Sequence, residues 1–288
     1  MFLSATVLSL VPRPPVLVGR VRLRGRGPGR IVGVAGRGCR PRRRYVRPGR
    51  SEVDPDAALA RALRSVAGDA SLSVAVSDTA SGATAVHGSG SYDTASIVKV
   101  GILATLLLRA QDAGRGLGVS ERTLAEAMIV HSDNASATAL WNAIGSAPGF
   151  DAGVRRLGLT RTRGGSNGEW GLTRTTARDQ LTLLRAVFGS DSELDAASRG
   201  CLTALMGRVV PGQAWGVSAA GHSWALKNGW LPRGDAARWT VHSVGRVTSG
   251  SSTRLIAVLS AGHTTLPAGI AVTEAAARAA VTATGGTG

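Results

Sequence analysis

Apolar and polar positions along the chain predict five β-strands in two groups. Alternating side chains over residues 71–77, a turn at Thr79-Ala80-Ser81-Gly82 and an apolar return over residues 83–87 predict a β-hairpin. Three more strand patterns follow near the C-terminus, at residues 224–230, 238–247 and 253–259. The two groups of strands are therefore far apart in the sequence.

Helical patterns lie before, between and after these strands. They cover residues 54–66, 95–110, 121–130, 135–144, 175–188, 192–209 and 268–281. Residues 95–110 are apolar on every side apart from Ser96, Lys99 and Thr105, so this helix is expected to be buried. The order of elements predicts an α+β fold, in which an antiparallel sheet is flanked by the terminal helices and has a helical subdomain beside it.

The positive charge of the chain is concentrated at its start. The net charge is +16, but residues 1–50 hold 13 arginines and no acidic residue, so the remainder is nearly neutral. These residues are rich in Arg, Gly and Pro, which predicts a disordered leader or tail, and residues 51–288 are expected to form the folded domain. The run Arg40-Pro41-Arg42-Arg43-Arg44 could attract nucleic acid or anionic lipid, but a solvated segment is the simpler interpretation. We expect no specific nucleic-acid partner.

Composition disfavours several classes of protein. No apolar run is long enough for a membrane span. In residues 1–11 the charges follow the apolar stretch, whereas a secretory signal has them in front. Cys39 and Cys201 lie in different regions, so no disulfide framework is indicated. No cluster of potential ligands has metal-site spacing, and we expect neither a metal nor a cofactor. A monomer is expected.

A candidate nucleophile and its base lie at the start of the buried helix. Ser96 and Lys99 are three residues apart and share one helical face. Burial among apolar side chains lowers the pKa of a lysine, which can then take the proton of a serine hydroxyl. The alternative is a structural lysine whose amine reaches the surface.

The rarity of lysine supports a chemical role. Among 34 basic residues only Lys99 and Lys227 are lysines. Arginine does not lose its proton in proteins, whereas a buried lysine can, so lysine retained in an arginine-rich chain suggests chemistry that needs an amine. Lys227 opens Lys227-Asn228-Gly229 on a predicted strand. Ser132-Asp133-Asn134 falls between two predicted helices, where short polar side chains can project into a cleft or simply cap a helix.

The order Ser96-x-x-Lys99, Ser132-Asp133-Asn134 and Lys227-x-Gly229 resembles the motif order of the penicillin-recognising serine enzymes, and most closely that of class A β-lactamases. The resemblance covers about residues 54–284. It implies a serine hydrolase that opens β-lactam amides through an acyl-enzyme. The substrate would be a small β-lactam or a stem peptide of peptidoglycan.

The resemblance implies roles in the acylation step. Ser96 would be the nucleophile and Lys99 its proton acceptor. Ser132 would pass a proton to the departing nitrogen. The backbone N–H groups of Ser96 and Trp230 match the positions of the oxyanion hole.

The resemblance also implies substrate contacts. Asn134 would hold the side-chain amide of the substrate, and Lys227 would bring positive charge to the substrate carboxylate and to Ser132. The third motif departs from the usual pattern, because Asn228 stands before Gly229 where a hydroxyl residue is typical. The Asn228 amide can still donate to a carboxylate. The interval between Ser96 and Ser132 is also shorter than in typical class A enzymes.

Glu169 is a candidate for activating the deacylating water. Its offset from Ser132 and the pattern Glu169-x-x-Leu172 match the class A glutamate. Thr173 replaces the usual asparagine in this loop, which is shortened. The opposing interpretation is a solvated loop glutamate.

Several other functions stay open. A peptidoglycan D,D-peptidase of the same fold would acylate on D-Ala-D-Ala ends and release penicillin slowly. An esterase is a further option, suggested by Asn228 and the shorter cleft. A non-catalytic β-lactam-binding or peptidoglycan-binding protein is disfavoured by the two retained lysines. Because these substrates are met outside the cytoplasmic membrane, we expect export, although the leader is not typical of a signal.

Overall fold

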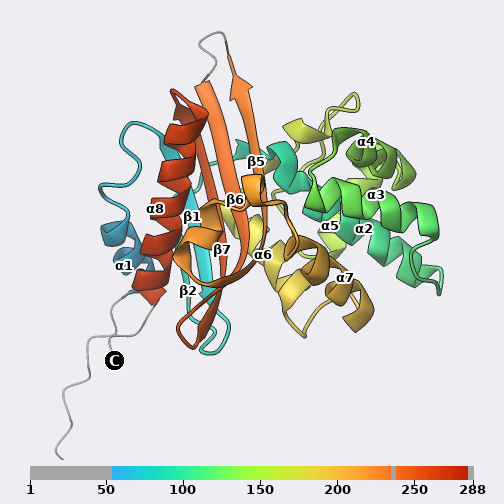
Figure 1. The fold of residues 1–288 in the computed structure, drawn as a ribbon, viewed down its shortest axis with the longest axis horizontal. Helices are drawn as coiled ribbons and strands as arrows, with labels where there is room; N and C mark the ends of the chain where they lie inside the picture. Colours follow the sequence, from blue (N-terminus) through green and yellow to red (C-terminus); the bar gives the residue numbers. More distant parts are fainter. Residues whose placement is uncertain (1–53, 235–237, 285–288) are drawn as a thin grey trace, which may run out of the picture. The chain divides into compact units, whose positions relative to one another are not determined.

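Five antiparallel strands form the sheet on which the fold is built (Figure 1). The structure is a computed structural model that describes residues 54–234 and 238–284. The sheet order is β2-β1-β7-β6-β5, with β1 (Ser71–Asp78), β2 (Thr84–His87), β5 (Ser223–Arg233), β6 (Arg238–Ser249) and β7 (Ser252–His263). All residues of β1 pair with β7, so the two predicted groups of strands join in one sheet. The predicted leader at residues 1–50 lies outside the described residues.

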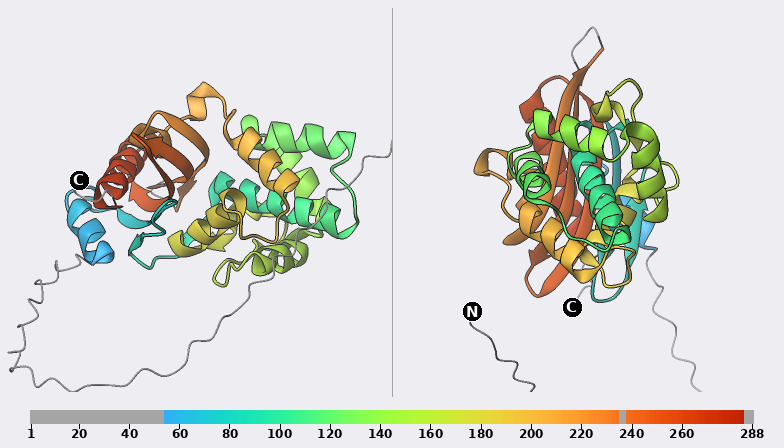
Figure 2. Two further views of the ribbon diagram at one scale, coloured as in Figure 1. Left: turned by 90° about the horizontal axis from the view of Figure 1, so that it is seen from below. Right: turned by 90° about the vertical axis from the view of Figure 1, so that its right-hand side faces the viewer.

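Successive side chains along the strands point to opposite faces of the sheet, and each face packs in its own apolar core. Val74 and Val76 of β1 lie in one core, whereas Ala75 between them lies in the other. The first core contains helices α1 (Pro55–Ala62) and α8 (Leu266–Thr284). Figure 2 shows α1 and α8 on one side of the sheet and the other helices on the opposite side. The predicted α+β fold, with terminal helices on an antiparallel sheet, is confirmed.

The helical subdomain is built around a buried helix. Its members are α2 (Val98–Asp112), α3 (Val119–Val130), α4 (Asn134–Ala143), α5 (Ser146–Arg156), α6 (Ala177–Phe188) and α7 (Ala196–Met206). Ile102, Leu103 and Ala104 of α2 have no exposed surface, as the apolar sequence predicts. Two short strands, β3 (Tyr92–Asp93) and β4 (Arg174–Thr175), pair outside the main sheet. In the described part of the chain, no helix has the length and apolar character needed to cross a membrane.

Helix α5 was not predicted from the sequence. It contains Pro148, Gly149 and Gly153, which lower helix propensity. The glycines allow close packing: a Cβ on Gly149 would lie 1.7 Å from the carbonyl oxygen of Ile144, and a Cβ on Gly153 would lie 2.4 Å from Thr105 Oγ1. Tertiary packing thus overrides local preference in this segment.

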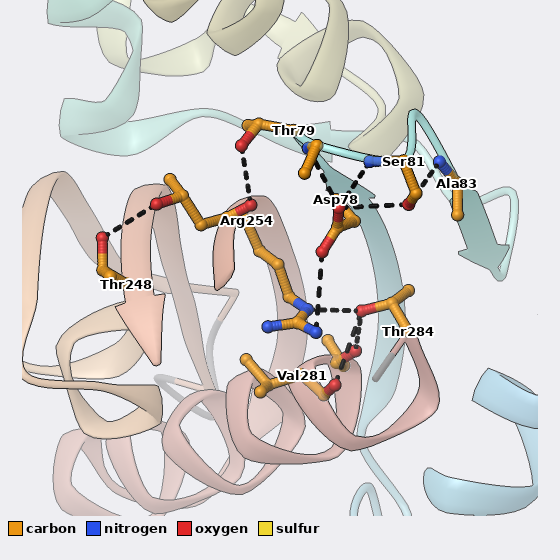
Figure 3. A network of polar contacts seen from close by, with 11 residues as sticks. Asp78, Thr79, Ser81, Ala83, Thr248, Arg254, Val281 and Thr284 are labelled. Carbon is orange, nitrogen blue, oxygen red and sulfur yellow. Dashed lines mark hydrogen bonds and ion pairs between the residues drawn. The ribbon is translucent and has the colours of Figure 1, made fainter. Parts of the chain in front are cut away.

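A buried arginine connects three elements at one end of the sheet (Figure 3). Arg254 of β7 donates from Nε to Thr284 Oγ1 of α8 at 2.8 Å, and its Nη2 lies 3.6 Å from Asp78 Oδ2. Asp78 Oδ1 accepts hydrogen bonds from the backbone of Ala80 and Ser81 in the hairpin turn. The bond from the Ser81 backbone is the largest influence that holds the pKa of Asp78 below its usual value. The predicted turn is therefore joined to the last helix.

His242 joins strand β6 to the segment that leads to Ser96. Its ring has no exposed surface. Nδ1 accepts a hydrogen bond from the backbone N–H of Ser260 at 3.2 Å, so Nε2 carries the proton and donates to the carbonyl oxygen of Asp93 at 2.8 Å. Burial lowers the pKa of His242 to about 4. A second proton would remove the acceptor that Ser260 uses.

The free energy of unfolding is expected to fall as the pH drops from about 6.5 to about 4. In this window the unfolded chain binds a proton at His242 and the folded chain does not, so stability that is complete above the window is lost within it. The expected loss is about 3 kcal/mol. Urea unfolding at several pH values measures it. His242→Gln should flatten the slope and His222→Gln, at an exposed site, should not; equal slopes for wild type and H242Q would contradict the assignment.

Candidate active site

Ser96 lies in a short 3₁₀ helix, η1 (Ala95–Ile97), that contacts strand β5. The contact is closest at Gly229, where a Cβ would lie 2.8 Å from the backbone nitrogen of Ser96 and 2.9 Å from the carbonyl oxygen of Thr94. Only glycine fits here, which accounts for the glycine of the third motif. Ala95 has a φ of +47°, a conformation that is unfavourable for alanine and that is often found at functional sites. Packing therefore holds the backbone that presents Ser96.

Lys99 lies in the first turn of α2 and has no exposed surface. Its Nζ donates to the carbonyl oxygen of Ser132 at 2.6 Å, to Ser132 Oγ at 3.1 Å and to Asn134 Oδ1 at 2.8 Å. The alternative of an amine that reaches the surface is wrong, because the whole side chain is enclosed. None of its hydrogen bonds to described residues goes to the Ser96 hydroxyl.

The Ser132 hydroxyl is shared by two amines. Lys227, which also has no exposed surface, donates to Ser132 Oγ at 3.0 Å and to the carbonyl oxygen of Asn228 at 3.1 Å. Ser132 has a φ of +59°. Asp133 caps helix α4 by accepting a hydrogen bond from the backbone N–H of Ser136 at 2.7 Å. The turn between α3 and α4 therefore has a defined geometry, and it connects α2 to β5.

Both amines have lowered pKa values. Burial lowers the pKa of Lys99 to about 8, with Asp133 acting in the opposite direction. Burial, followed by the charge of Lys99, lowers the pKa of Lys227 to about 7. Neither lysine forms a salt bridge with a carboxylate of the described chain. Both amines can therefore exchange protons near neutral pH, and the hydroxyl they share can relay a proton.

Trp170, rather than Glu169, lies over the Lys99 amine. The Trp170 ring centroid is 5.0 Å from Lys99 Nζ, and its Nε1 donates to Thr138 Oγ1 of α4 at 3.1 Å. Glu169 directly precedes the 3₁₀ helix η2 (Trp170–Leu172) and its side chain is exposed. The carboxylate is not among the partners of Lys99. Its proposed part in deacylation stays a prediction, which the geometry of the loop does not favour.

Asn228 makes internal contacts in place of the predicted substrate contact. Its side chain has no exposed surface, and its Nδ2 donates to the carbonyl oxygens of Gln213 and Trp215 at 2.8 and 2.9 Å. These carbonyls belong to residues 210–220, which we call the strap and which contain η3 (Pro211–Gln213) and η4 (Gly216–Ala220). The amide therefore cannot reach a ligand without giving up these two bonds.

Trp230 and Asn134 lie at the partly open edges of the site. Trp230 follows Gly229 on β5, so its backbone is next to the contact with Ser96, and its ring packs on Trp215 with the centroids 5.7 Å apart. Asn134 begins α4 with an exposed side chain whose Oδ1 accepts from Lys99. These positions are compatible with the predicted roles of both residues.

The predicted residues thus fall into three sets. Hydrogen bonds join Lys99, Ser132, Asn134 and Lys227, and close backbone contact joins Ser96 to Gly229, which precedes Trp230. The side chains of Glu169 and Asn228 belong to neither set. The positions of Trp170 and Trp215 at the site were not predicted from the sequence, although the chain has only 6 tryptophans and their scarcity was a usable signal. Among the described residues no group of His, Cys, Asp and Glu could hold a metal ion.

One comparison with known proteins identifies a family. A family model described as the Beta-lactamase enzyme family matches residues 108–284, which include Ser132 and Lys227 but begin after Lys99. The search of curated proteins finds no match. A solved class A β-lactamase from Bacteroides cellulosilyticus DSM 14838 is 16% identical, with a TM-score of 0.69 over 80% of this chain and 98% of the other.

Two further solved structures share the fold. A β-lactamase from Burkholderia vietnamiensis is 22% identical, with a TM-score of 0.65 over 83% of this chain and 100% of the other. A mutant of PBP-A, solved as an acyl-enzyme complex with penicillin G, is 18% identical, with a TM-score of 0.66 over 77% of this chain and 94% of the other. At these identities the likeness concerns the fold.

Proposed function

The chain belongs to the β-lactamase enzyme family, and on that premise we propose that it is a serine hydrolase that opens β-lactam amides through an acyl-enzyme on Ser96. One observation carries the proposal: a single hydroxyl, Ser132 Oγ, accepts hydrogen bonds from two buried amines of lowered pKa, Lys99 and Lys227. Amide cleavage needs a nucleophile, a base and an acid for the leaving nitrogen. The site has a candidate for each.

In the proposed acylation, Lys99 acts in its neutral form. It takes the Ser96 hydroxyl proton while the oxygen attacks the amide carbon, and a C–O bond forms. The Ser96 hydroxyl is not yet hydrogen-bonded to Lys99, which is common before substrate binds. The backbone N–H groups of Ser96 and Trp230 would stabilise the developing oxyanion, at about 3 kcal/mol per donor.

In the proposed cleavage, Ser132 donates its proton to the amide nitrogen as the C–N bond breaks. Ser132 then recovers a proton from Lys99, which holds the one taken from Ser96 and lies within hydrogen-bond distance. Lys227 stabilises the negative charge that Ser132 carries in passing. Protons balance over the step, and the acyl group remains on Ser96 until water removes it.

A second candidate function is a peptidoglycan D,D-peptidase that releases penicillin slowly. The observation in its favour is the position of Glu169, which is exposed, whereas Trp170 covers the amine. A class A β-lactamase uses a carboxylate near the ester to activate water, whereas the hydrogen bonds of Lys99 to the described residues go to Ser132 and Asn134 and not to Glu169. We place either activity outside the cytoplasmic membrane, where its substrates are met.

The two candidates differ in the lifetime of the acyl-enzyme. With a chromogenic cephalosporin, continuous turnover supports the β-lactamase, whereas a burst of one equivalent followed by a slow phase supports the peptidase. Intact-mass measurement should show penicillin bound covalently in both cases. Absence of any adduct on the folded protein would contradict both and leave a non-catalytic binding protein or an esterase.

Glu169→Ala tests the part of the loop carboxylate. Because the side chain is exposed and is not a hydrogen-bond partner of Lys99, we expect the adduct lifetime to change by less than about threefold. Stopped-flow acylation followed by time-resolved mass measurement gives the lifetime. An adduct that persists about a hundredfold longer would instead establish Glu169 as the deacylating base, with Glu193→Ala, at another exposed site, as the control.

A further inference from the structure

We propose that Asn228 is a specificity-determining residue, and that the site accepts amides and esters with an uncharged group on the leaving-group side. The inference rests on the proposed function and names its substrate class. Ser132 would protonate the departing nitrogen, so the leaving group must lie beside Ser132 and its partner Lys227. The side chains around Lys227 therefore decide what that group can be.

Asn228 has no donor left for a substrate. Both N–H groups of its amide are engaged by the carbonyl oxygens of Gln213 and Trp215. This assignment of the amide is forced, since the opposite orientation would bring an oxygen against two carbonyl oxygens. The remaining atom, Oδ1, is buried and has no partner among residues 54–234 and 238–284, and as an acceptor it disfavours a carboxylate.

The neighbouring polar groups are engaged in the same way. Ser243 Oγ on β6 accepts from the backbone N–H of Val217 at 2.9 Å. Lys227 has no exposed surface and uses its amine on Ser132 and on the Asn228 carbonyl. Its charge therefore reaches a substrate mainly through Ser132.

Two arginines beside the strap, Arg208 just before it in the sequence and Arg278 bonded to its Ala219 carbonyl, are already paired. Arg208 forms a salt bridge with Glu126, and Arg278 lies 3.8 Å from Glu274 while donating to the Ala219 carbonyl. Neither guanidinium is a dedicated anchor for a substrate carboxylate.

The strap is held in place at both ends. The two N–H groups of the Asn228 amide are therefore not released easily from the strap carbonyls. The backbone N–H of Val210 donates to the carbonyl of Val130 at 3.2 Å, and Gln213 Nε2 donates to the carbonyl of His131 at 3.3 Å. Gly216 has a φ of +77°, and a Cβ there would lie 2.3 Å from Ser243 Oγ. The strap is therefore in close contact with β6 at one end and bonded to the turn that carries Ser132 at the other.

In place of a hydrogen-bond donor, the strap presents an aromatic surface to the site. Asn228 holds the backbone of Trp215, whose ring packs against Trp230 at 5.7 Å with the planes inclined by 55°. Both side chains are partly exposed. An indole pair formed between the strap and β5 favours an apolar neighbour over a hydrated anion.

The test compares a chromogenic cephalosporin carrying its free carboxylate with the methyl ester of the same compound. For the wild-type protein we expect kcat/KM for the ester to be at least about one third of that for the acid. Asn228→Thr supplies a hydroxyl donor and frees the site of its unpaired oxygen, so it should raise the preference for the acid about tenfold, mainly through KM. Ser218→Ala is the matched control, because it removes a bond within the strap, to the Ala214 carbonyl, and should leave the preference unchanged.

A wild-type preference for the acid above about a hundredfold would overturn the inference, and this measurement does not depend on any variant folding. An unchanged preference in folded N228T would overturn it as well. This outcome can be distinguished from failure of the proposed function. If intact-mass measurement shows that neither compound acylates Ser96, the hydrolase assignment fails. If both compounds acylate Ser96 and only the ratio of kcat/KM between ester and acid differs from the expected one, the role of Asn228 fails.

Discussion

Replacing Ser96 with alanine is expected to abolish both the covalent adduct with penicillin and the turnover of a chromogenic cephalosporin. The hydroxyl is the only group in the proposed mechanism that bonds to the acyl carbon, so kcat should fall by at least about 10⁴-fold. Intact-mass spectrometry of the wild type and of S96A after the same exposure measures the first effect, and steady-state kinetics the second.

The fold should survive this substitution. Ser96 is only partly buried, and alanine keeps the backbone contact with Gly229 that positions η1. Ser91→Ala, in the exposed loop before β3, is the control and should retain the adduct. If S96A still acquires the mass of one opened β-lactam at the wild-type rate, another residue is the nucleophile and the proposed chemistry is incorrect.

Lys99→Arg is expected to lower the rate of acylation about 10³-fold while leaving a positive charge at the site. Removal of a general base typically costs about 10²- to 10⁴-fold, and arginine cannot supply the neutral form. In the wild type, the acylation rate should rise with pH as Lys99 loses its proton and fall again as Lys227 loses its charge, with a maximum between about pH 7 and 8. In K99R the rise should disappear.

Lys227→Arg tests whether Lys227 acts through its positive charge or through its ability to lose a proton. Lys227 is proposed to act on Ser132 by its charge, so K227R should retain more activity than K99R if the larger side chain is accommodated. Stopped-flow acylation between pH 5.5 and 9.5 provides the profiles, with a thermal melt to establish that each variant is folded. A K99R rate within about tenfold of the wild type would remove Lys99 from the role of base.

Local sequence was sufficient for most of the secondary structure because the signals were strong. The apolar run of α2 and the alternation in β1 both predict elements that the structure contains. The exceptions are short or dense in glycine: β3 and β4 are two residues each, and α5 depends on glycines at points of close contact. In those places the packing partner, which is distant in sequence, decides the conformation.

The candidate site was predictable where a residue's chemistry is unusual for this chain. Two lysines among many arginines led to Lys99 and Lys227, the spacing from Lys99 led to Ser96, and the motif Ser132-Asp133-Asn134 led to Ser132. Glu169 and Asn228 were harder, because an offset along the chain does not determine where a loop side chain points. Trp170 lies over Lys99 only because η2 turns back onto α4, where Thr138 binds its Nε1.

The sequence alone determined the order of elements and identified the groups proposed to attack, accept and donate protons, because these depend on residue type and short-range periodicity. Only the tertiary structure decided that one hydroxyl, Ser132, meets both amines, that Glu169 is exposed and that Asn228 binds the strap. Burial and hydrogen bonding arise when α2, the α3–α4 turn, β5 and the strap come together. The pKa values and free donors that govern reactivity are properties of that assembly.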